Sequence, residues 1–295
     1  MKKSLFSLLC TISLIGFSQN LTKIDHFGQN KGNLKMYTYV PENLDLNNRT
    51  PLVFVLHGCT QSAEQIALET GWNKLADSLH FIVVYPEQKQ INNATKCFNF
   101  FIGFKAKKDK GEVASIRQMI DYCFENYQID SSQIFITGMS AGGGMTNAML
   151  NAYPNVFNAG AIVAGPSTLF DANNTSSEKQ PRIAILQGDA DKIVIPNNAN
   201  KILDHWLTKH RIEKNNVDTI NDYQKHAQLT VHLFRNTDQE TKVIVLTEKG
   251  IAHKILINPG EKLNEGGAMD FHTEDINFHS TFWIAQFFGL TPKKD

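Results

Sequence analysis

Three polar residues that lie far apart in the chain, Ser140, Asp191 and His253, are of the types that form a nucleophilic catalytic triad. Ser140 is the centre of a Gly-x-Ser-x-Gly pentapeptide at 138–142, which follows a β-branched and aromatic run and precedes a run of small residues. This order predicts a nucleophile elbow, in which a serine on a strained strand-to-helix turn exposes its hydroxyl. Glycines flank such a serine because neighbouring backbones come too close for a Cβ.

Two aspartates follow a predicted buried strand, and one of them is expected to be the acid of the triad. Residues 182–187 (RIAILQ) form this strand, and Asp189 and Asp191 come directly after it. In the topology that uses a nucleophile elbow, the acid follows the serine and precedes the histidine. Asp189 is near enough to the strand to shape the turn, whereas Asp191 is far enough out to contact the histidine. Asp191 is the predicted acid and Asp189 the alternative.

His253 is the predicted base of the triad. It follows residues 242–247 (KVIVLT), another predicted strand, so it lies beyond a carboxyl end, where open α/β sheets place their sites. His272 and His279 compete with it, but they come before or within the predicted last helix, where a histidine is usually a surface or capping residue. A serine, an acid and a histidine in this order predict acyl transfer through a covalent serine intermediate.

Two backbone N–H groups are expected to form an oxyanion hole. Residues 51–56 (PLVFVL) are continuously apolar, which is typical of a strand buried on both faces, and a His-Gly-Cys turn ends them. That turn can point the N–H of Cys59 into the site, and the elbow supplies the N–H of Ala141. His57 is interpreted as part of the turn, because it precedes the serine and is therefore in the wrong order to be the base.

Candidate substrate-binding residues lie beside this turn. They are Thr60 and two aromatic residues of the segment CFNFF at 97–101, Phe98 and Phe101, which would line a cleft for an aromatic or sugar group. Packing in the core is the default for aromatic side chains and is the alternative for both.

A group of acids and histidines near the carboxyl end, Asp270, His272, Asp275 and His279, lacks any standard metal-ligand spacing. No metal is therefore expected, and the predicted chemistry requires no organic cofactor.

Three cysteines would remain after removal of residues 1–18, which are predicted to be a signal peptide: Cys59, Cys97 and Cys123. Cys123 lies on the apolar side of a predicted helix and is interpreted as a buried thiol. Export would permit a disulfide between Cys59 and Cys97, although two free thiols are the alternative, because connectivity cannot be derived from sequence.

Strand and helix patterns alternate along the chain, which predicts a doubly wound, mostly parallel sheet with helices on both faces. Helices are expected after Ser62, which resembles a capping-box residue, with apolar positions up to Leu79, and over 112–127, 197–210 and 276–288. Strands are expected at 36–40, 51–56, 81–85, 134–136, 160–164, 182–187, 229–234 and 242–247. The segment 87–111 lacks periodicity and is expected to be a long loop beside the site.

The first 18 residues are predicted to be a signal peptide. Lys2 and Lys3 form a positive n-region, residues 5–17 an apolar stretch, and residues 16–18 a small-x-small cleavage site. A lipid anchor at Cys10 is the disfavoured alternative, because bulky Leu9 precedes it. Residues 19–295 are then expected to form a single catalytic domain that is secreted or periplasmic.

Composition excludes several other classes of protein. The chain has 29 Lys and Arg against 29 Asp and Glu, and the lysines are scattered among the acids, so no nucleic-acid surface is indicated. No other segment has the 18 uninterrupted apolar residues expected of a membrane span.

The motifs together resemble the esterase family named for poly(3-hydroxybutyrate) depolymerase, which is similar to the feruloyl and acetylxylan esterases of carbohydrate esterase family 1. The matching stretches, over about 35–290, include LHGCTQ at 56–61, TGWN at 70–73, YPE at 85–87, CFNFF at 97–101, TGMSAGG at 137–143, AGP at 164–166, GDAD at 188–191 and GIAH at 250–253. The resemblance implies an α/β-hydrolase fold, export, Ser140 as nucleophile, Asp191 as acid, His253 as base, and Cys59 and Ala141 as oxyanion donors.

The function expected from sequence is therefore that of a secreted serine carboxylic ester hydrolase. Its substrates are expected to be feruloyl or acetyl esters of plant polysaccharide, with short-chain polyhydroxyalkanoates as the alternative. A non-catalytic binding protein on a hydrolase frame and an acyltransferase that passes the group to a sugar are alternatives of other classes.

Overall fold

The structure, a computed structural model, describes residues 21–45, 47–103, 106–167 and 179–292, and the predicted signal peptide lies outside them. Ten strands form the main sheet: β1 (Thr22–Ile24), β2 (Lys35–Tyr39), β3 (Thr50–Leu56), β4 (Ile82–Glu87), β5 (Ile129–Met139), β6 (Ala159–Val163), β7 (Arg182–Gly188), β8 (Val217–Ile220), β9 (Leu229–Arg235) and β10 (Thr241–Glu248). Two short strands, β11 (Ile255–Ile257) and β12 (Thr273–Asp275), pair separately.

The main sheet has the strand order β1-β2-β4-β3-β5-β6-β7-β10-β9-β8. The six central strands, from β4 to β10 in this order, are parallel, and antiparallel strands flank them on both sides. Crossover helices between parallel neighbours account for this arrangement. The predicted α/β-hydrolase fold class is confirmed, and the carboxyl ends of β3, β5, β7 and β10 lie along one edge.

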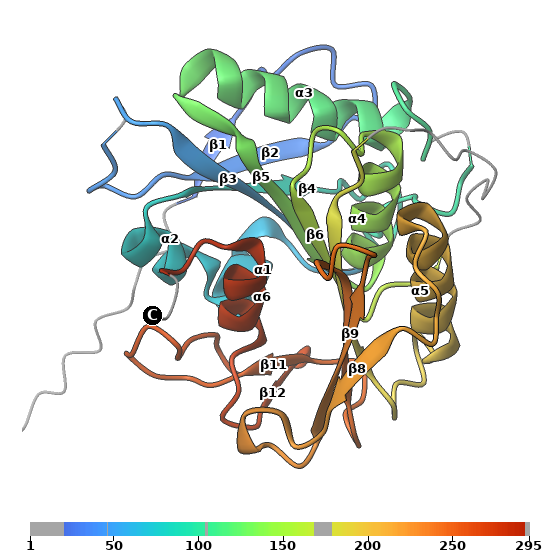
Figure 1. Ribbon diagram of the computed structural model, residues 1–295. Coiled ribbons are helices and arrows are strands. Elements are labelled where there is room, and N and C mark those ends of the chain that lie inside the picture. Colours follow the sequence, from blue (N-terminus) through green and yellow to red (C-terminus); the bar gives the residue numbers. More distant parts are fainter. Residues whose placement is uncertain (1–20, 46, 104–105, 168–178, 293–295) are drawn as a thin grey trace, which may run out of the picture.

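Helices cover both faces of the sheet (Figure 1). The first face packs against α3 (Gly111–Asn126), α4 (Ala141–Ala152) and α5 (Asn197–His210), and the second against α1 (Ala63–Thr70), α2 (Trp72–Leu79) and α6 (Ser280–Phe288). A 3-10 turn, η1 (Tyr223–Lys225), precedes β9. Two apolar clusters, one on each face, bury most of the large side chains, so the loops at the strand ends are carried by a rigid frame.

The helix expected after Ser62 is divided into two. Gly71 ends α1 in the left-handed conformation, with φ 71°, and α2 begins at the next residue. Ser62 caps α1 as expected, because its side chain accepts a hydrogen bond from Gln65 N. The break turns α2 so that Trp72 is buried, and it leaves Leu68 on α1 49% exposed.

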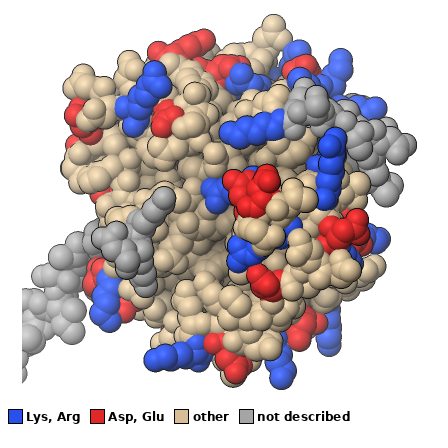
Figure 2. Space-filling model, viewed as in Figure 1, with Lys and Arg blue, Asp and Glu red and all other residues tan. Residues whose placement is uncertain are grey.

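Surface charge is mixed in sign. Figure 2 shows Lys and Arg interspersed with Asp and Glu among uncharged residues on the face that it presents. In the described part of the chain, no helix has both the length and the apolar character needed to cross a bilayer.

Four histidines, His57, His205, His210 and His279, are held inside the described structure as neutral side chains. Burial lowers the pKa of each to about 4. In the unfolded chain a histidine takes up a proton near pH 6.5. Between about pH 6.5 and pH 4 the unfolded state therefore binds more protons than the folded state, and stability must fall as the pH falls through this window.

We expect the melting temperature to decrease from pH 7.5 to pH 4.5, and the decrease to be smaller in a His210→Gln variant. A pKa depression of this size corresponds to up to about 3 kcal/mol for one histidine. Glutamine does not titrate and can still donate to the carbonyl of Pro181, which His210 contacts at 2.9 Å. Differential scanning fluorimetry at the two pH values measures the effect, and parallel losses in wild type and variant would contradict it.

Candidate active site

Ser140 lies between β5 and α4 in a conformation that few residues adopt. Its φ is 54° and its ψ −121°, and its N–H donates to the carbonyl of Val163 at 2.9 Å. A Cβ at Gly142 would lie 2.2 Å from Leu56 O, and one at Gly138 would lie 2.6 Å from the Gly142 carbonyl carbon. Only glycine fits at either position, which explains the pentapeptide. The crowded turn holds Ser140 partly exposed at the edge of the sheet.

Asp191 and His253 form a direct, mostly buried contact at the same edge. Asp191 Oδ2 lies 2.6 Å from His253 Nδ1, and the two side chains are 0% and 10% exposed. Asp191 Oδ1 accepts hydrogen bonds from the backbone N–H groups of Ile193 and Val194 at 2.8 and 2.9 Å. The carboxylate is thus held from both sides, and the Nε2 atom of His253 is the ring nitrogen that remains for another partner.

The parallel strands of the central sheet place these three residues along one edge. Ser140 follows β5, Asp191 follows β7 and His253 follows β10, and the order β5-β6-β7-β10 is continuous. The loops after β7 and β10 also touch, since Ala190 N donates to Ile251 O at 3.0 Å. Residues 51 to 113 positions apart in sequence are therefore placed at a single sheet edge, as their positions beyond strand ends predict.

Asp189 has a different partner. Its Oδ1 atom accepts a hydrogen bond from Gly250 N at 2.6 Å, and its side chain is exposed. Asp189 thus connects the turn after β7 to the turn after β10, and Asp191 is the aspartate in contact with the histidine.

A buried carboxyl group next to this pair is held in its neutral form. Burial, together with the charges of Glu274 and Asp191, raises the pKa of Glu248 to about 8. At neutral pH Glu248 is mostly uncharged, and it does not add a second negative charge beside Asp191.

His57 fixes the turn that follows β3. It is fully buried, its Nδ1 donates to Gly58 O at 2.6 Å, and its Nε2 accepts from Gln88 N at 3.0 Å. The carbonyl of Gly58 and the N–H of Cys59 belong to one trans peptide and point in opposite directions. The bond from His57 therefore fixes the direction of the Cys59 N–H. With both ring nitrogens occupied, His57 is a structural part of the turn.

The N–H group of Ala141 directly follows Ser140 in the chain, and the turn that carries the N–H group of Cys59 comes close to Ser140. A Cβ at Gly58 would come within 3.4 Å of Ser140 Cβ. Neither N–H donates a hydrogen bond to another residue of the described ranges. Two unpaired donors beside a nucleophile are suited to stabilising the oxyanion of a tetrahedral intermediate.

A disulfide joins Cys59 to Cys97, and Cys123 is a buried free thiol. Beside the disulfide, Thr60 N donates to Thr95 O at 2.6 Å. The turn at residues 57–60, which carries the candidate oxyanion donor Cys59 and is named the oxyanion turn for it, is thus tied to the long loop before α3, whose described part has no regular secondary structure.

The candidate substrate-binding residues divide into two groups. Thr60 is exposed and Phe101 is 61% exposed, so both are available to a ligand. The expectation for Phe98 is corrected: its side chain is 0% exposed, and its ring packs against His57 with centroids 4.9 Å apart. Phe98 supports the oxyanion turn from below and cannot touch a substrate without displacement of the core.

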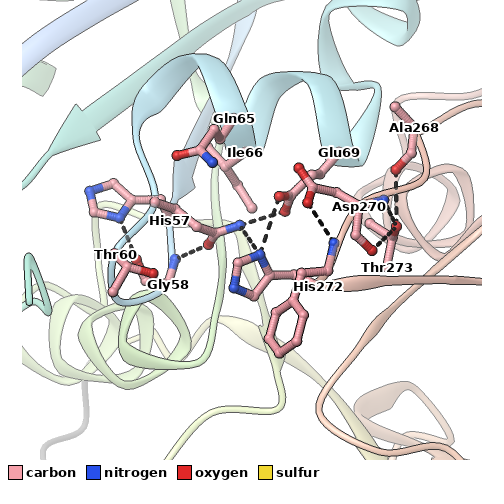
Figure 3. Close-up of polar contacts among 12 residues, drawn as sticks. His57, Gly58, Thr60, Gln65, Ile66, Glu69, Ala268, Asp270, His272 and Thr273 are labelled. Carbon is pink, nitrogen blue, oxygen red and sulfur yellow. Dashed lines mark hydrogen bonds and ion pairs between the residues drawn. The ribbon is translucent and has the colours of Figure 1, made fainter.

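Of the two competing histidines, His279 is at the N-cap position of α6, as expected of a capping residue, but its side chain makes no capping hydrogen bond. His279 is 4% exposed, and its Nε2 donates to Thr70 O at 2.9 Å. His272 is partly buried beside the turn of His57 and Gly58, with Nδ1 3.3 Å from Glu69 Oε1 (Figure 3). Among the described residues, no group of three His, Cys, Asp or Glu side chains is arranged to hold a metal ion.

Two residues near this turn have roles that sequence patterns did not indicate. Gln61 accepts a hydrogen bond from Gly58 N at 2.6 Å and donates one to Glu69 at 2.5 Å. Gln61 belongs to the LHGCTQ stretch at 56–61, so the family resemblance could have identified it. No sequence pattern pointed to Glu69 on α1. An acidic residue in an amphipathic helix is usually exposed, whereas Glu69 is 0% exposed.

The known proteins that this chain resembles are named as esterases or depolymerases. A family model described as esterase PHB depolymerase matches residues 34–178. Poly(3-hydroxyalkanoate) depolymerase C from Paucimonas lemoignei is 32% identical over 299 residues, which cover 92% of this chain and 70% of that protein. Feruloyl esterase B from Thermothelomyces thermophilus is 30% identical, with 68% and 78% covered.

A solved structure shares the fold over almost the whole chain. The acetyl xylan esterase from Aspergillus awamori superposes with a TM-score of 0.75 at 20% identity, and the match covers 92% of this chain and 99% of that one.

Proposed function

Because this chain belongs to the esterase family of PHB depolymerases and is a carboxylic ester hydrolase, we propose that Ser140, Asp191 and His253 are its catalytic triad. The observation that carries the proposal is the buried 2.6 Å contact between Asp191 and His253 at the sheet edge that holds Ser140. An imidazole whose Nδ1–H is held by a carboxylate presents a basic Nε2 to a serine hydroxyl.

In the proposed mechanism, His253 Nε2 takes the proton of Ser140 as its Oγ attacks the ester carbonyl carbon. The N–H groups of Cys59 and Ala141 hold the oxyanion. The protonated His253 gives its proton to the departing alcohol, and an acyl group remains on Ser140. Water activated by His253 then attacks this acyl-enzyme, which releases the acid and restores the serine.

A fluorophosphonate ester tests the nucleophile without knowledge of the natural substrate. It should add one phosphonyl group per chain, and peptide mass spectrometry should locate that group on Ser140. A His253→Ala variant should react far more slowly, because the base that activates the serine is gone. Labelling at another residue, or equal labelling of this variant, would refute the proposed triad.

For the substrate we propose acyl esters of plant polysaccharide, feruloyl or acetyl. Support comes from the match to feruloyl esterase B, of which this chain covers 78%. Hydrolysis of short-chain polyhydroxyalkanoates is the second candidate, and the depolymerase match over 92% of this chain favours it. We further propose that the enzyme is exported, on the basis of the predicted signal peptide and the disulfide.

A substrate panel separates the two candidates. Purified protein lacking residues 1–18 is assayed with acetylated xylan, methyl ferulate and 3-hydroxybutyrate oligomers, and kcat/KM is compared. Activity confined to the hydroxybutyrate oligomers would overturn the polysaccharide assignment and leave the triad intact.

Gly58→Ala is expected to lower kcat by about 10- to 100-fold with little change in KM. The added Cβ would lie 2.9 Å from Gln61 Oε1 and 3.4 Å from Ser140 Cβ, so the oxyanion turn must shift. Loss of one oxyanion donor costs roughly 10²–10³ in rate. Gly103→Ala is the control, since a Cβ there meets nothing within 4 Å. Equal steady-state constants for both variants would contradict the prediction.

A further inference from the structure

The oxyanion turn is connected to a buried carboxyl group through one side-chain amide. Gly58 N–H donates to Gln61 Oε1 at 2.6 Å, and Gln61 Nε2 donates to Glu69 Oε2 at 2.5 Å. The orientation of the amide follows from its partners, because the reversed orientation would place its NH2 group against the N–H of Gly58. Gln61 therefore relays the position of Glu69 to the peptide that precedes the oxyanion donor.

Glu69 is held within the fold by partners from two other segments, Gln61 in the turn after β3 and His272 before β12. Its side chain is 0% exposed in the last turn of α1, and His272 Nδ1 lies 3.3 Å from its second oxygen. The titratable groups that face it are His272 and Asp270. Burial raises the pKa of Glu69, and His272 opposes this effect. Figure 3 shows Glu69 and His272 pointing toward each other beside the turn that carries His57 and Gly58.

Stability alone does not explain a carboxyl group at this position. Removing a carboxylate from water is costly, and well-packed apolar residues often replace buried ionic groups without loss of stability. Ala63, Ile66 and Ala67, the apolar buried residues of α1, pack against the sheet, and the hydroxyl of buried Thr70 is bonded within the helix to Ile66 O. Glu69 supplies what they cannot, a fixed acceptor for the Gln61 amide.

We propose that Glu69 is a positioning residue for ester hydrolysis, which holds Gln61 and through it the Gly58 peptide, so that the Cys59 N–H stays directed at the reacting carbonyl oxygen. The inference rests on the proposed role of Cys59 in the oxyanion hole. His57 fixes the peptide that follows Gly58, and the Gln61–Glu69 pair fixes the peptide that precedes it. With both restraints the turn has one orientation.

The first test compares Glu69→Leu with Glu69→Gln on p-nitrophenyl acetate. Leucine removes the carboxylate and leaves Gln61 Nε2 only the more distant His272 Nδ1, at 3.3 Å. We therefore expect kcat to fall by about 10- to 100-fold with KM within twofold, up to the loss expected for one oxyanion donor. Glutamine keeps an acceptor for the Gln61 amide and should retain at least a third of kcat. Glu64→Gln, on the exposed side of the same helix, is the matched control and should behave as wild type.

A second variant keeps the test decisive where leucine prevents folding. Glu69→Asp retains the charge but withdraws the carboxylate by one methylene, and it should lower kcat by about tenfold in a folded protein. For each variant, Ki for phenylboronic acid, which forms a tetrahedral adduct with an active serine, should rise in proportion to the loss in kcat/KM.

The double variant Gln61→Leu/Glu69→Leu tests whether the two residues act in series. In that case its kcat should equal that of Gln61→Leu alone. The proposal is overturned by multiplied losses, by a loss confined to KM, or by folded Glu69→Leu or Glu69→Asp with kcat within twofold of wild type. Failure of the proposed function itself would be seen separately, as turnover that survives Ser140→Ala.

Discussion

Replacing Ser140 by alanine is expected to lower kcat for ester hydrolysis by about 10⁴- to 10⁶-fold. The Oγ atom is the proposed nucleophile, and its removal leaves only the oxyanion donors and binding to accelerate attack by water. The fold should persist, because Ser140 is fixed by its backbone, through its bond to Val163 O, and the strain of its positive φ remains the same for alanine. Progress curves with p-nitrophenyl acetate, at high enzyme concentration, measure the residual rate.

Ser78→Ala is the matched control for this experiment. Ser78 is an exposed serine on α2 whose hydroxyl contacts only Lys74 O in the described structure. It should retain wild-type kcat. Turnover of the Ser140 variant within tenfold of wild type would show that the observed hydrolysis does not use this serine, and would exclude the triad.

The parts of the fold that were predictable have strong local signals. The parallel strands of the centre are buried on both faces, so they appear as continuous apolar runs such as residues 51–56. The edge strand β8, Val217–Ile220, is exposed throughout and has no apolar face to reveal it. The break at Gly71 was hidden because apolar residues keep helical spacing across it, while glycine takes the left-handed conformation.

The candidate site was predictable at residues of a catalytic type that directly follow a recognisable strand. Ser140, Asp191 and His253 each follow an apolar strand, and parallel strands place such positions at one edge. The orientation of individual side chains was not predictable. The sequence of the CFNFF segment does not show that Phe98 faces inward while Phe101 faces solvent. Nor does sequence show that Glu69 points into the core, because its partner His272 is 203 residues away.

The contrast between the two aspartates after β7 gives the most specific test of the acid. In Asp191→Asn, the side-chain oxygen should stay with the N–H groups of Ile193 and Val194, which contact Oδ1 in the native residue. The NH2 group would then face His253 Nδ1, and two donors cannot pair. The imidazole must move its proton to Nε2, which removes the lone pair that accepts the Ser140 proton.

We therefore expect Asp191→Asn to lower kcat by about 10⁴-fold near neutral pH, with little change in melting temperature, as in the general behaviour of triads whose acid is amidated. Asp189→Asn should stay within about twofold of wild type, because an amide oxygen can still accept the bond from Gly250 N. Both variants change one carboxylate to its amide in the same turn, so charge and position are matched. If Asp189→Asn lost more kcat than Asp191→Asn, the acid role would pass to Asp189. In the proposed mechanism the acid is the aspartate that orients His253, and in the structure that residue is Asp191.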